Sequence, residues 1–564
     1  MNLIDATAHV KSQIMAPGGP FEIVDKQVTG QTFKVYANAP INLSQVVNDS
    51  RRTDDRNFLV YKEQRLTFKD FFEQVDSMAT WMHAQKITQG DRVVIAMRNR
   101  PEWIIAFCAA ALIGAVPAPL NSFGTGQELR EAIAIIEPKL IVCDSTRWLR
   151  INEKTPWSGK TILLNDLQVD VNEQADTTSF GDTILCVAVK LPMPQINETD
   201  PALVLFTSGA SSKAKAVVSS HLAVCQSLFN IDYISAVSAM TSPQTVAKIM
   251  EKALVPTLLT AVPLFHVSGL HAQLFSALRA GRRLIFTHKW EVASAIELIK
   301  QEQVTQFNGA PSMVMQLLRD PDFHTPDVMK TFGGLGFGGS GLPTSLIDSA
   351  LSSLDEHMIG VGFGMTETNG VCAAMAGELF RHKPKSSGLL SPIMETRICS
   401  PEGLVLANNE LGEICMRGVC LMDGYLGNDA ATSETLKSGW LHSGDIGYID
   451  DDGFLYIVDR IKDVIIRAGE NISTAEVESC LLEHPKVDEA AVFGIPDEET
   501  GESIVAAVSL LDNESLTEAE LRNHVTQHLA KYKVPAHLHI VTSKLPRNPA
   551  GKLLKNELKK ALYV

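Results

Sequence analysis

The chain has 564 residues, more than one hydrophobic core usually serves, so the sequence predicts a large body with at least one smaller domain. Hydrophobic residues make up 45% of it and charged residues 20%, an ordinary balance for a globular protein. The formal net charge of −15 argues against nucleic acid as a partner, because such binding depends on clustered Lys and Arg. An anionic ligand would need a local basic site.

Cysteine usage and the first residues indicate a cytoplasmic protein. The nine cysteines are scattered without a Cys-x-x-Cys pair, which is typical of reduced structural thiols. His266 and His271 have a spacing that zinc could use, but no cysteine pair accompanies them. Residues 1–10 include Asp5 and His9 and lack the basic and apolar blocks of a secretory signal, so no export is expected.

Apolar runs typical of strands alternate with apolar runs typical of helices along most of the chain. Extended runs such as residues 92–97 alternate with helical stretches such as 101–113, a pattern that predicts α/β layers with helices packed on sheets. The longest apolar run, 103–116, is stopped by Pro117. It is too short to span a bilayer and is interpreted as a buried helix.

The best domain boundary lies near residue 460. We predict a body of residues 1–459, a hinge of residues 460–462 and a small α+β domain of residues 463–564. Inside the small domain, Ser473 and Glu476 form a Ser-x-x-Glu pattern, which predicts a helix with a capping box at its start. Repeats of fixed period and low-complexity tracts are absent from the sequence, so a solenoid is not expected.

Residues 203–216 combine an apolar strand with a loop of hydroxyls, one glycine and two lysines. Hydroxyls and amides in such a turn can bind phosphate oxygens, and lysine can neutralise them. Loops of this composition are also common as solvated turns, so the segment alone leaves phosphate binding open.

This loop resembles the phosphate loop of the adenylate-forming superfamily, which includes acyl-CoA synthetases, luciferases and adenylation domains. The residues that fit its Thr-Ser-Gly-Thr-Thr-Gly-x-Pro-Lys-Gly pattern are Thr207, Ser208, Gly209, Ser211 and Lys215. Ser212, Ala214 and Ala216 depart from the pattern, because they replace two glycines and a proline. The departure bears on the rate of ATP turnover more than on the fold.

Residues 363–367, Phe-Gly-Met-Thr-Glu, resemble the aromatic-Gly-Met-Thr-Glu motif of the same superfamily. The resemblance implies that Phe363 and Gly364 bind adenine and that Thr366 contacts the phosphate and the acyl carboxylate. It also implies that Glu367, with Thr207, holds magnesium. A carboxylate oxygen suits a hard cation that bridges phosphates.

Two further segments resemble the ribose and hinge motifs. Residues 439–445 resemble Gly-Trp-x-x-Thr-Gly-Asp, which implies that Asp445 accepts hydrogen bonds from both ribose hydroxyls. Residues 459–463 resemble the hinge motif, which implies that Arg460 faces the ribose or phosphates and that Lys462 is the pivot.

Residues 545–552 resemble the Pro-Arg-x-x-x-Gly-Lys motif, whose lysine bridges the carboxylate and the α-phosphate during adenylation. Pro549 and Gly551 would fix the turn that presents Lys552. The motifs follow in family order over nearly the whole chain. The resemblance makes residues 1–459 the AMP-binding adenylation domain and implies a mobile small domain, which brings Gly469 to the site for the pantetheine arm of CoA.

A glycine-rich segment offers a competing interpretation. Residues 336–341 satisfy Gly-x-Gly-x-x-Gly, with Asp355 at about the distance of a dinucleotide-binding acid. This acid precedes the next predicted strand, whereas a ribose-binding acid belongs at a strand's carboxyl end. We therefore favour the family's interpretation, in which Gly339 and Ser340 line the adenine and acyl pocket.

Residues 262–269 resemble the motif that gates the acyl pocket. Amino-acid-activating relatives have an Asp where this chain has His266, which cannot supply a fixed negative charge, so amino-acid substrates are disfavoured. Met313 and Val314 add no counter-charge. The amino-terminal third, including residues 98–103 and 119–121, also resembles bacterial long-chain and side-chain acyl-CoA ligases.

The sequence thus predicts an ATP-dependent acyl-CoA synthetase that uses ATP, Mg²⁺ and CoA on a fatty acid of medium or long chain, or on a side-chain acid. His266, Lys215, Thr366, Glu367 and Lys552 are the expected catalytic residues. Two alternatives stay open: an acyl-AMP ligase that loads an acyl carrier protein, and a non-catalytic acyl-nucleotide-binding protein. The oligomeric state and a weak peripheral contact with a membrane are also left open.

Overall fold

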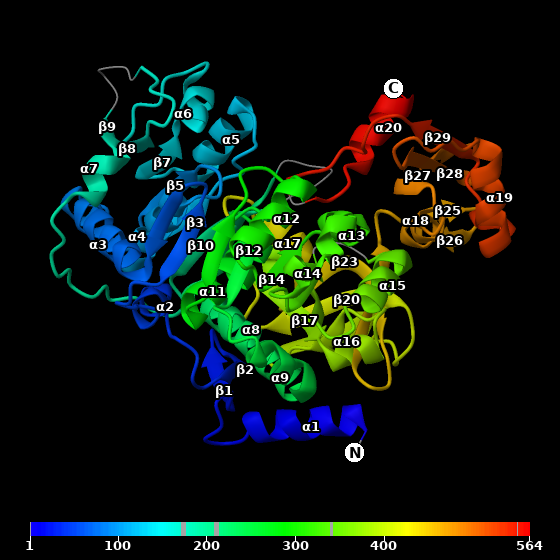
Figure 1. Cartoon of the computed structure of the whole chain (residues 1–564), viewed down its shortest axis with the longest axis horizontal. Helices are drawn as coiled ribbons and strands as arrows, with labels where there is room; N and C mark the ends of the chain where they lie inside the picture. Colours follow the sequence, from blue (N-terminus) through cyan, green and yellow to red (C-terminus); the bar gives the residue numbers. More distant parts are fainter. Residues whose placement is uncertain (1, 171–175, 208–213, 339–341, 550, 564) are drawn as a thin grey trace.

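The computed structural model describes residues 2–170, 176–207, 214–338, 342–549 and 551–563. Figure 1 shows a large body of helices and sheets, with the last elements of the chain grouped beside it in orange and red. The predicted α/β class, with a large amino-terminal body and a smaller carboxyl-terminal α+β unit, is confirmed.

The largest sheet of the described residues runs through the middle of the body. Strands β3, β13, β12, β14, β15 and β16 are parallel neighbours, so their carboxyl ends meet at one edge. In spatial order the strands are β19 (Met394–Cys399), β20 (Gly412–Gly418), β23 (Trp440–Ile449), β24 (Phe454–Arg460), β18 (Gly388–Leu390), β17 (Gly370–Ala376), β16 (Met358–Met365), β15 (Gly334–Gly338), β14 (Gln306–Gly309), β12 (Thr257–Thr260), β13 (Arg283–Phe286), β3 (Asn57–Tyr61) and β4 (Gln64–Thr67), with β22 (Leu436–Lys437) beside β23.

Among the described residues, three smaller sheets complete the body. The second sheet is all parallel, in the order β6 (Val116–Pro119), β5 (Arg92–Ala96), β7 (Leu140–Asp144), β8 (Thr161–Leu164) and β9 (Thr177–Ser179). An antiparallel sheet contains β10 (Pro201–Phe206), β11 (Ala216–Ser220) and β21 (Gly424–Tyr425), and a hairpin contains β1 (Ile23–Val28) and β2 (Gln31–Tyr36).

Helices cover these sheets, as apolar β-runs buried on both faces require. Residues 101–111 are all buried in α4, which confirms the predicted buried helix, although the helix ends at Leu112 and Val116 already begins β6. The helical elements of the body are α1 (Leu3–Ile14), α2 (Leu43–Asp49), α3 (Phe68–Ala84), α4 (Pro101–Leu112), α5 (Gly126–Ile136), α6 (Ser145–Asn152), α7 (Phe180–Ile184), α8 (His221–Met240), α9 (Pro243–Glu251), α10 (Val267–Gly269), η1 (Leu270–Phe275), α11 (Ser276–Ala280), α12 (Val292–Gln301), α13 (Pro311–Arg319), η2 (Pro321–His324), α14 (Pro326–Met329), α15 (Thr344–Ser353), η3 (Thr366–Thr368), α16 (Glu378–His382) and α17 (Asp429–Thr435).

The last hundred residues build their own sheet and cores. Its apolar clusters draw only on residues between 465 and 562. The elements are β25 (Ile465–Arg467), β26 (Glu470–Ile472), α18 (Thr474–Leu482), β27 (Val487–Asp497), β28 (Gly501–Leu510), α19 (Glu518–His528), η4 (Lys531–Lys533), β29 (His537–Val541) and α20 (Lys555–Tyr563). β24 ends in the large sheet at Arg460 and β25 begins in the small one at Ile465. The division at residues 460–462 and the swing of the small unit remain predictions.

The predicted capping box of α18 is half right. Ser473 caps the helix, because its hydroxyl accepts a hydrogen bond from the Glu476 amide. The reciprocal bond is absent from the described contacts of Glu476, whose carboxylate instead binds the Lys533 ammonium at 2.7 Å. An ammonium is the stronger partner for this carboxylate than a backbone amide.

Across the described residues, no helix combines the length and the apolar character needed to cross a membrane.

Candidate active site

One cavity of about 1060 Å³ follows the parallel strands of the large sheet and reaches the small domain. At the carboxyl ends of the strands its wall contains most of the site residues predicted from the sequence. These are Thr207, Lys215, His266, Phe363, Gly364, Thr366, Glu367, Arg460, Lys462 and Lys552. Ser208, Gly209, Ser211, Gly339 and Ser340 lie outside the described residues.

Thr207 and Lys215 are held opposite each other at the two ends of the predicted phosphate loop. The Thr207 amide donates to the Lys215 carbonyl at 3.0 Å, and the Lys215 amide donates to the Thr207 hydroxyl at 3.2 Å. The Lys215 ammonium lies 4.6 Å from the centre of the Tyr425 ring, a cation–π contact. This arrangement keeps the ammonium at the cavity wall.

Tyr425 is a site residue that sequence reasoning missed. It is buried in β21, lines the cavity, and its hydroxyl donates to Oε1 of Glu367 at 2.8 Å. Burial, and then the nearby Glu367 charge, raise the pKa of Tyr425, so the hydroxyl stays a donor. The segment Gly424-Tyr-Leu-Gly427 was the available signal, because paired glycines around an aromatic often mark a close approach of the backbone.

Gly364 is required by backbone geometry. The register between β16 and β17 shifts between Phe363 and Gly364, and a Cβ at Gly364 would lie 1.6 Å from the Gly370 carbonyl oxygen. No other residue fits this bulge without moving a strand. The bulge presents Phe363, Thr366 and Glu367 at the end of β16.

Asp445 lies behind the cavity wall. It is 5% exposed and lies opposite Arg460 on the neighbouring strand. Its carboxylate forms an ion pair with the Arg460 guanidinium at 3.0 Å. Burial raises the pKa of Asp445, while Arg460 and Lys552 oppose the shift. Glu413 positions the preceding turn, because its carboxylate accepts from the Gly444 amide at 3.1 Å. Reception of the ribose by Asp445 remains a prediction.

Lys552 is presented by a tight turn. Its amide donates to the Asn548 side chain at 2.9 Å, and Gly551 has φ +85°. A Cβ at Gly551 would lie 2.7 Å from Cβ of Ala310, so the turn sits against the end of β14. Burial, followed by repulsion from Arg460 and Lys462, lowers the pKa of Lys552 to about 8.

Two imidazoles line the middle of the cavity. Burial lowers the pKa of His266 to about 4 and that of His271 to about 4, so both are neutral at pH 7. Nδ1 of His271 lies 2.7 Å from the Asn369 carbonyl and must donate to it. Nε2 of His266 has no partner within the described part of the chain, so it is available to a substrate.

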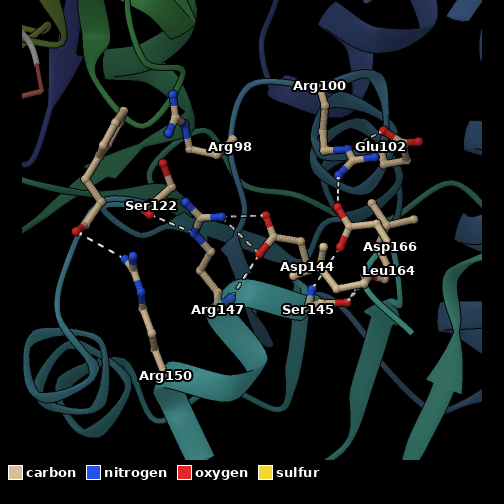
Figure 2. A network of polar contacts seen from close by, with 12 residues as sticks. Arg98, Arg100, Glu102, Ser122, Asp144, Ser145, Arg147, Arg150, Leu164 and Asp166 are labelled. Carbon is tan, nitrogen blue, oxygen red and sulfur yellow. Dashed lines mark hydrogen bonds and ion pairs between the residues drawn. The ribbon is translucent and has the colours of Figure 1, made fainter. Parts of the chain in front are cut away.

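The segment after β5 fixes this region. The Asn99 amide group donates to the Val262 carbonyl at 2.8 Å and accepts from the Leu264 amide at 2.9 Å. Figure 2 shows the neighbouring polar network, in which Arg147 binds Asp144 and the Ser122 carbonyl. Asn99, which belongs to the segment 98–103 found by resemblance, therefore holds the residues just before His266.

Gly469 does not reach the cavity in this arrangement. It lies with Ala468 in the exposed turn between β25 and β26, where both residues have positive φ. Its contact with a pantetheine arm depends on a movement of the small domain and remains a prediction.

The groups at this end of the cavity fit a magnesium nucleotide. Lys215, Arg460, Lys462 and Lys552 supply positive charge for phosphates. Glu367 and Thr207 supply the oxygen ligands that magnesium takes. An apolar branch of the same cavity continues from these groups along the sheet. Fold and site together define an enzyme that activates an organic acid with a nucleoside triphosphate.

The comparisons with known proteins give the family. Residues 46–426 match the AMP-binding enzyme family, and residues 476–552 match the AMP-binding enzyme C-terminal domain. The chain belongs to the AMP-binding enzyme family. It is 31% identical over 481 residues to a 4-coumarate–CoA ligase from Vanilla planifolia, covering 84% of this chain and 85% of that protein. It is 29% identical to 4-coumarate–CoA ligase CCL1 from Humulus lupulus, covering 88% and 89%.

Solved structures agree. The o-succinylbenzoate CoA synthetase of Bacillus subtilis, bound to its acyl-adenylate, is 28% identical with a TM-score of 0.72, covering 92% of this chain and 98% of that one. The same enzyme with ATP and a magnesium ion gives a TM-score of 0.73. The predicted superfamily and the predicted cofactors ATP, Mg²⁺ and CoA are confirmed at the level of adenylate-forming CoA ligases. The chain is an ATP-dependent acyl-CoA ligase of this family.

Proposed function

We propose that this ligase activates an extended carboxylic acid, either a fatty acid of medium to long chain or a ring-bearing side-chain acid, and transfers it to CoA. The observation that carries the proposal is the length of the cavity. Its wall includes β16 from Met358 to Met365, which spans about 23 Å at the usual rise of a strand. A short acid would leave most of this space unfilled.

Glycines keep the cavity open beside the sheet. Gly334, Gly336 and Gly338 alternate along β15, and Gly360 and Gly362 alternate along β16 ahead of the bulge at Gly364, all of them in the cavity wall. Alternating residues share one face of a strand. Glycine weakens a strand, so its repeated use has a reason at each position: at Gly336 and Gly338 a Cβ would meet a neighbouring strand, and at Gly362 the missing side chain leaves room in the cavity. A Cβ at Gly362 would make only ordinary contacts, at 3.5 Å and beyond.

The opposite wall is mainly apolar. It comes from α8 and α9, with Ile231, Ile234, Val246 and Ile249 among the lining residues. Within the described residues, Glu367 is the one acidic side chain of the cavity wall. An amino-acid substrate would therefore lack an ammonium partner in the acyl branch, whereas an alkyl chain gains free energy by leaving water.

In the first half-reaction a carboxylate oxygen of the acid attacks the α-phosphorus of ATP, and pyrophosphate leaves. Lys552 is assigned to the incoming carboxylate and the α-phosphate, and Lys215 to the leaving phosphates. Both ammonium groups line the cavity end where these phosphates fit. Magnesium held by Glu367 and Thr207 would offset the charge that grows on the phosphate oxygens.

In the second half-reaction the CoA sulfur attacks the acyl carbon, and AMP leaves with the bond electrons. Lys552 fills the approach to the acyl carbon in the present arrangement, because its turn packs on Ala310. We assign Lys462 as the pivot of a swing that withdraws Lys552 and brings in Gly469, whose missing side chain leaves room for a slim arm.

The test is pyrophosphate release with palmitate, octanoate, 4-coumarate and phenylalanine, each with ATP, Mg²⁺ and CoA. Palmitate or octanoate should give the highest kcat/KM, together with acyl-CoA and AMP. A preference for phenylalanine would contradict the proposal. If the acyl group passes from acyl-AMP only to an acyl carrier protein, that protein and not CoA is the acceptor. If no acid gives pyrophosphate release, the chain is a non-catalytic binding protein.

The relatives named 4-coumarate–CoA ligases favour a second candidate, an aryl acid. Such an acid is shorter than β16 and would occupy only the part of the cavity near Thr366. A higher kcat/KM for 4-coumarate than for every alkyl acid in the panel would identify an aryl acid as the substrate.

A further inference from the structure

The far end of the cavity contains a guanidinium. Arg282 directly precedes β13 and lines the cavity, and its Nη1 donates to the Gln306 side chain at 3.3 Å. Gln306 begins β14, whereas Ala310, just after this strand, touches the turn that carries Lys552. Four residues of extended chain separate the two ends, about 13 Å. Arg282 is therefore remote from the adenylation chemistry.

Arg282 has no ion pair of its own in the described part of the chain. No carboxylate of the described residues lies within ion-pair distance of it, and Asp232, the acid whose charge acts on it, already pairs with Arg279 at 2.6 Å. Burial lowers the pKa of Arg282, although Asp232 opposes the shift. A partly buried cation that shares its nearby counter-charge with a second arginine costs free energy, which a bound anion would recover.

Arg282 also has unused hydrogen-bond donors. A guanidinium carries five N–H donors, and the bond to Gln306 is its one side-chain hydrogen bond within the described residues. Ser276 lines the cavity too, and its hydroxyl makes no hydrogen bond in the described part of the chain. Planar donors of this kind match the two oxygens of a carboxylate.

Lys252, a second cation of the cavity wall, finds its hydrogen-bond acceptors in the protein itself. The Lys252 ammonium donates to the Met329 carbonyl at 3.1 Å and to the Phe332 carbonyl at 2.9 Å. These carbonyls lie at and after the end of α14, where a cation is favourable. The hydrogen bonds of Lys252 thus explain its presence in the wall by a structural role. Arg282 has no comparable set of partners among the described residues.

We propose that Arg282 binds a second carboxylate at the far end of the substrate, so that the preferred substrates are long α,ω-dicarboxylic acids or ring-bearing acids with a distal carboxylate. The inference rests on the proposed function and names its substrate class more closely. Pro256, which also lines this end, is exposed, so the distal carboxylate keeps part of its hydration. That lowers the cost of bringing a second charge into the cavity.

The experiment compares acids of equal length, sebacate with decanoate and dodecanedioate with dodecanoate, by pyrophosphate release. Wild-type enzyme should favour each diacid by at least about tenfold in kcat/KM. Arg282→Met should lower kcat/KM for the diacids by about 10- to 100-fold, as expected when a charge-assisted hydrogen bond is lost, and leave the monoacids nearly unchanged. Arg282→Lys should retain part of the preference.

Lys252→Met is the matched control, because it removes a cation of the same cavity that carbonyls already satisfy. It should leave the diacid-to-monoacid ratio unchanged. This ratio is measured on one preparation, so a partly unfolded variant does not alter it. A wild-type enzyme without diacid preference, or an equal loss for both acids in Arg282→Met, overturns the inference. Failure of every acid in both series would instead contradict the proposed function.

Discussion

The hydroxyl of Tyr425 donates a 2.8 Å hydrogen bond to the carboxylate of Glu367. The same ring lies 4.6 Å from the Lys215 ammonium. One aromatic side chain therefore contacts both the residue assigned to magnesium and the lysine assigned to the phosphates. Because β21 pairs with β11, the strand that follows the phosphate loop, this contact also ties the loop to the end of β16.

Tyr425→Phe should slow adenylation by about tenfold or more and raise the Mg²⁺ concentration needed for half-maximal rate. The substitution keeps the ring under Lys215 and removes one hydrogen bond to a charged group, worth about 1.5–3 kcal/mol. Pyrophosphate release measured against Mg²⁺ concentration checks both effects.

Tyr233→Phe is the control, since its hydroxyl is buried and has no partner among the described residues. It should leave both quantities unchanged. If the two variants behave alike, Tyr425 does not position Glu367.

Gly362→Val should reduce kcat/KM for palmitate at least about tenfold while activity with butyrate persists. The new side chain would enter the cavity from β16, where a Cβ has Ala374, the Ala373 carbonyl and Val371 as its nearest neighbours, all at ordinary distances, so the strand should stay folded. A matched substitution is Gly364→Ala, whose Cβ would meet a backbone carbonyl oxygen at 1.6 Å. That variant should lose activity with all acids. Equal loss for long and short acids in Gly362→Val would show that the acyl chain does not pass this strand.

His271 should make the fold sensitive to acid. Burial lowers its pKa to about 4 in the folded chain, from an ordinary value near 6.5. Between these values the unfolded chain binds a proton that the folded chain does not, so the free energy of unfolding falls as pH drops from about 6.5 toward 4. By pH 5 the loss is about 2 kcal/mol from this one group.

Urea unfolding at pH 7 and pH 5 measures this loss. In His271→Gln the difference between the two pH values should shrink by about 2 kcal/mol relative to wild type. His9→Gln, at an exposed position on α1, should leave the difference as it is. An unchanged difference in His271→Gln would show that this imidazole does not titrate on unfolding.

Local patterns predicted most of the fold. The run 103–116 is apolar on every face of a helix, so burial of α4 followed from it directly. The predicted strand before Phe363 is β16. The capping box of α18 was predicted only in part, because Lys533 lies 57 residues from Glu476 and no local pattern shows that the two meet. Partners from distant parts of the chain are decided by tertiary packing.

The site divides in the same way. Residues inside motifs, such as Thr207, Glu367 and Lys552, line the cavity as expected. Tyr425 and Arg282 could not be assigned from the sequence, because their roles depend on which strand ends meet. The length of the acyl branch was equally hidden, since it arises only when the alternating glycines of β15 and β16 lie side by side.

The pH dependence of adenylation should follow the titration of Lys552. Burial, with repulsion from Arg460 and Lys462, lowers the pKa of Lys552 to about 8, and the ammonium form is the one that can pair with carboxylate and α-phosphate. The pH profile of kcat/KM reports groups of the free enzyme, so kcat/KM for ATP should fall as pH rises through about 8. Lys552→Arg keeps its charge at all these pH values and should remove that decline, whatever its absolute rate.

Lys552→Ala separates the two half-reactions. Adenylation, followed by pyrophosphate release, should fall by about two orders of magnitude or more, the scale expected when one preorganised donor to developing charge is lost. Transfer from acyl-adenylate supplied ready-made, followed by thiol consumption, should largely survive, because the proposed swing about Lys462 would take this side chain out of the site. Equal damage to both half-reactions would mean that Lys552 supports the turn against Ala310 or the hinge, and does not act on ATP.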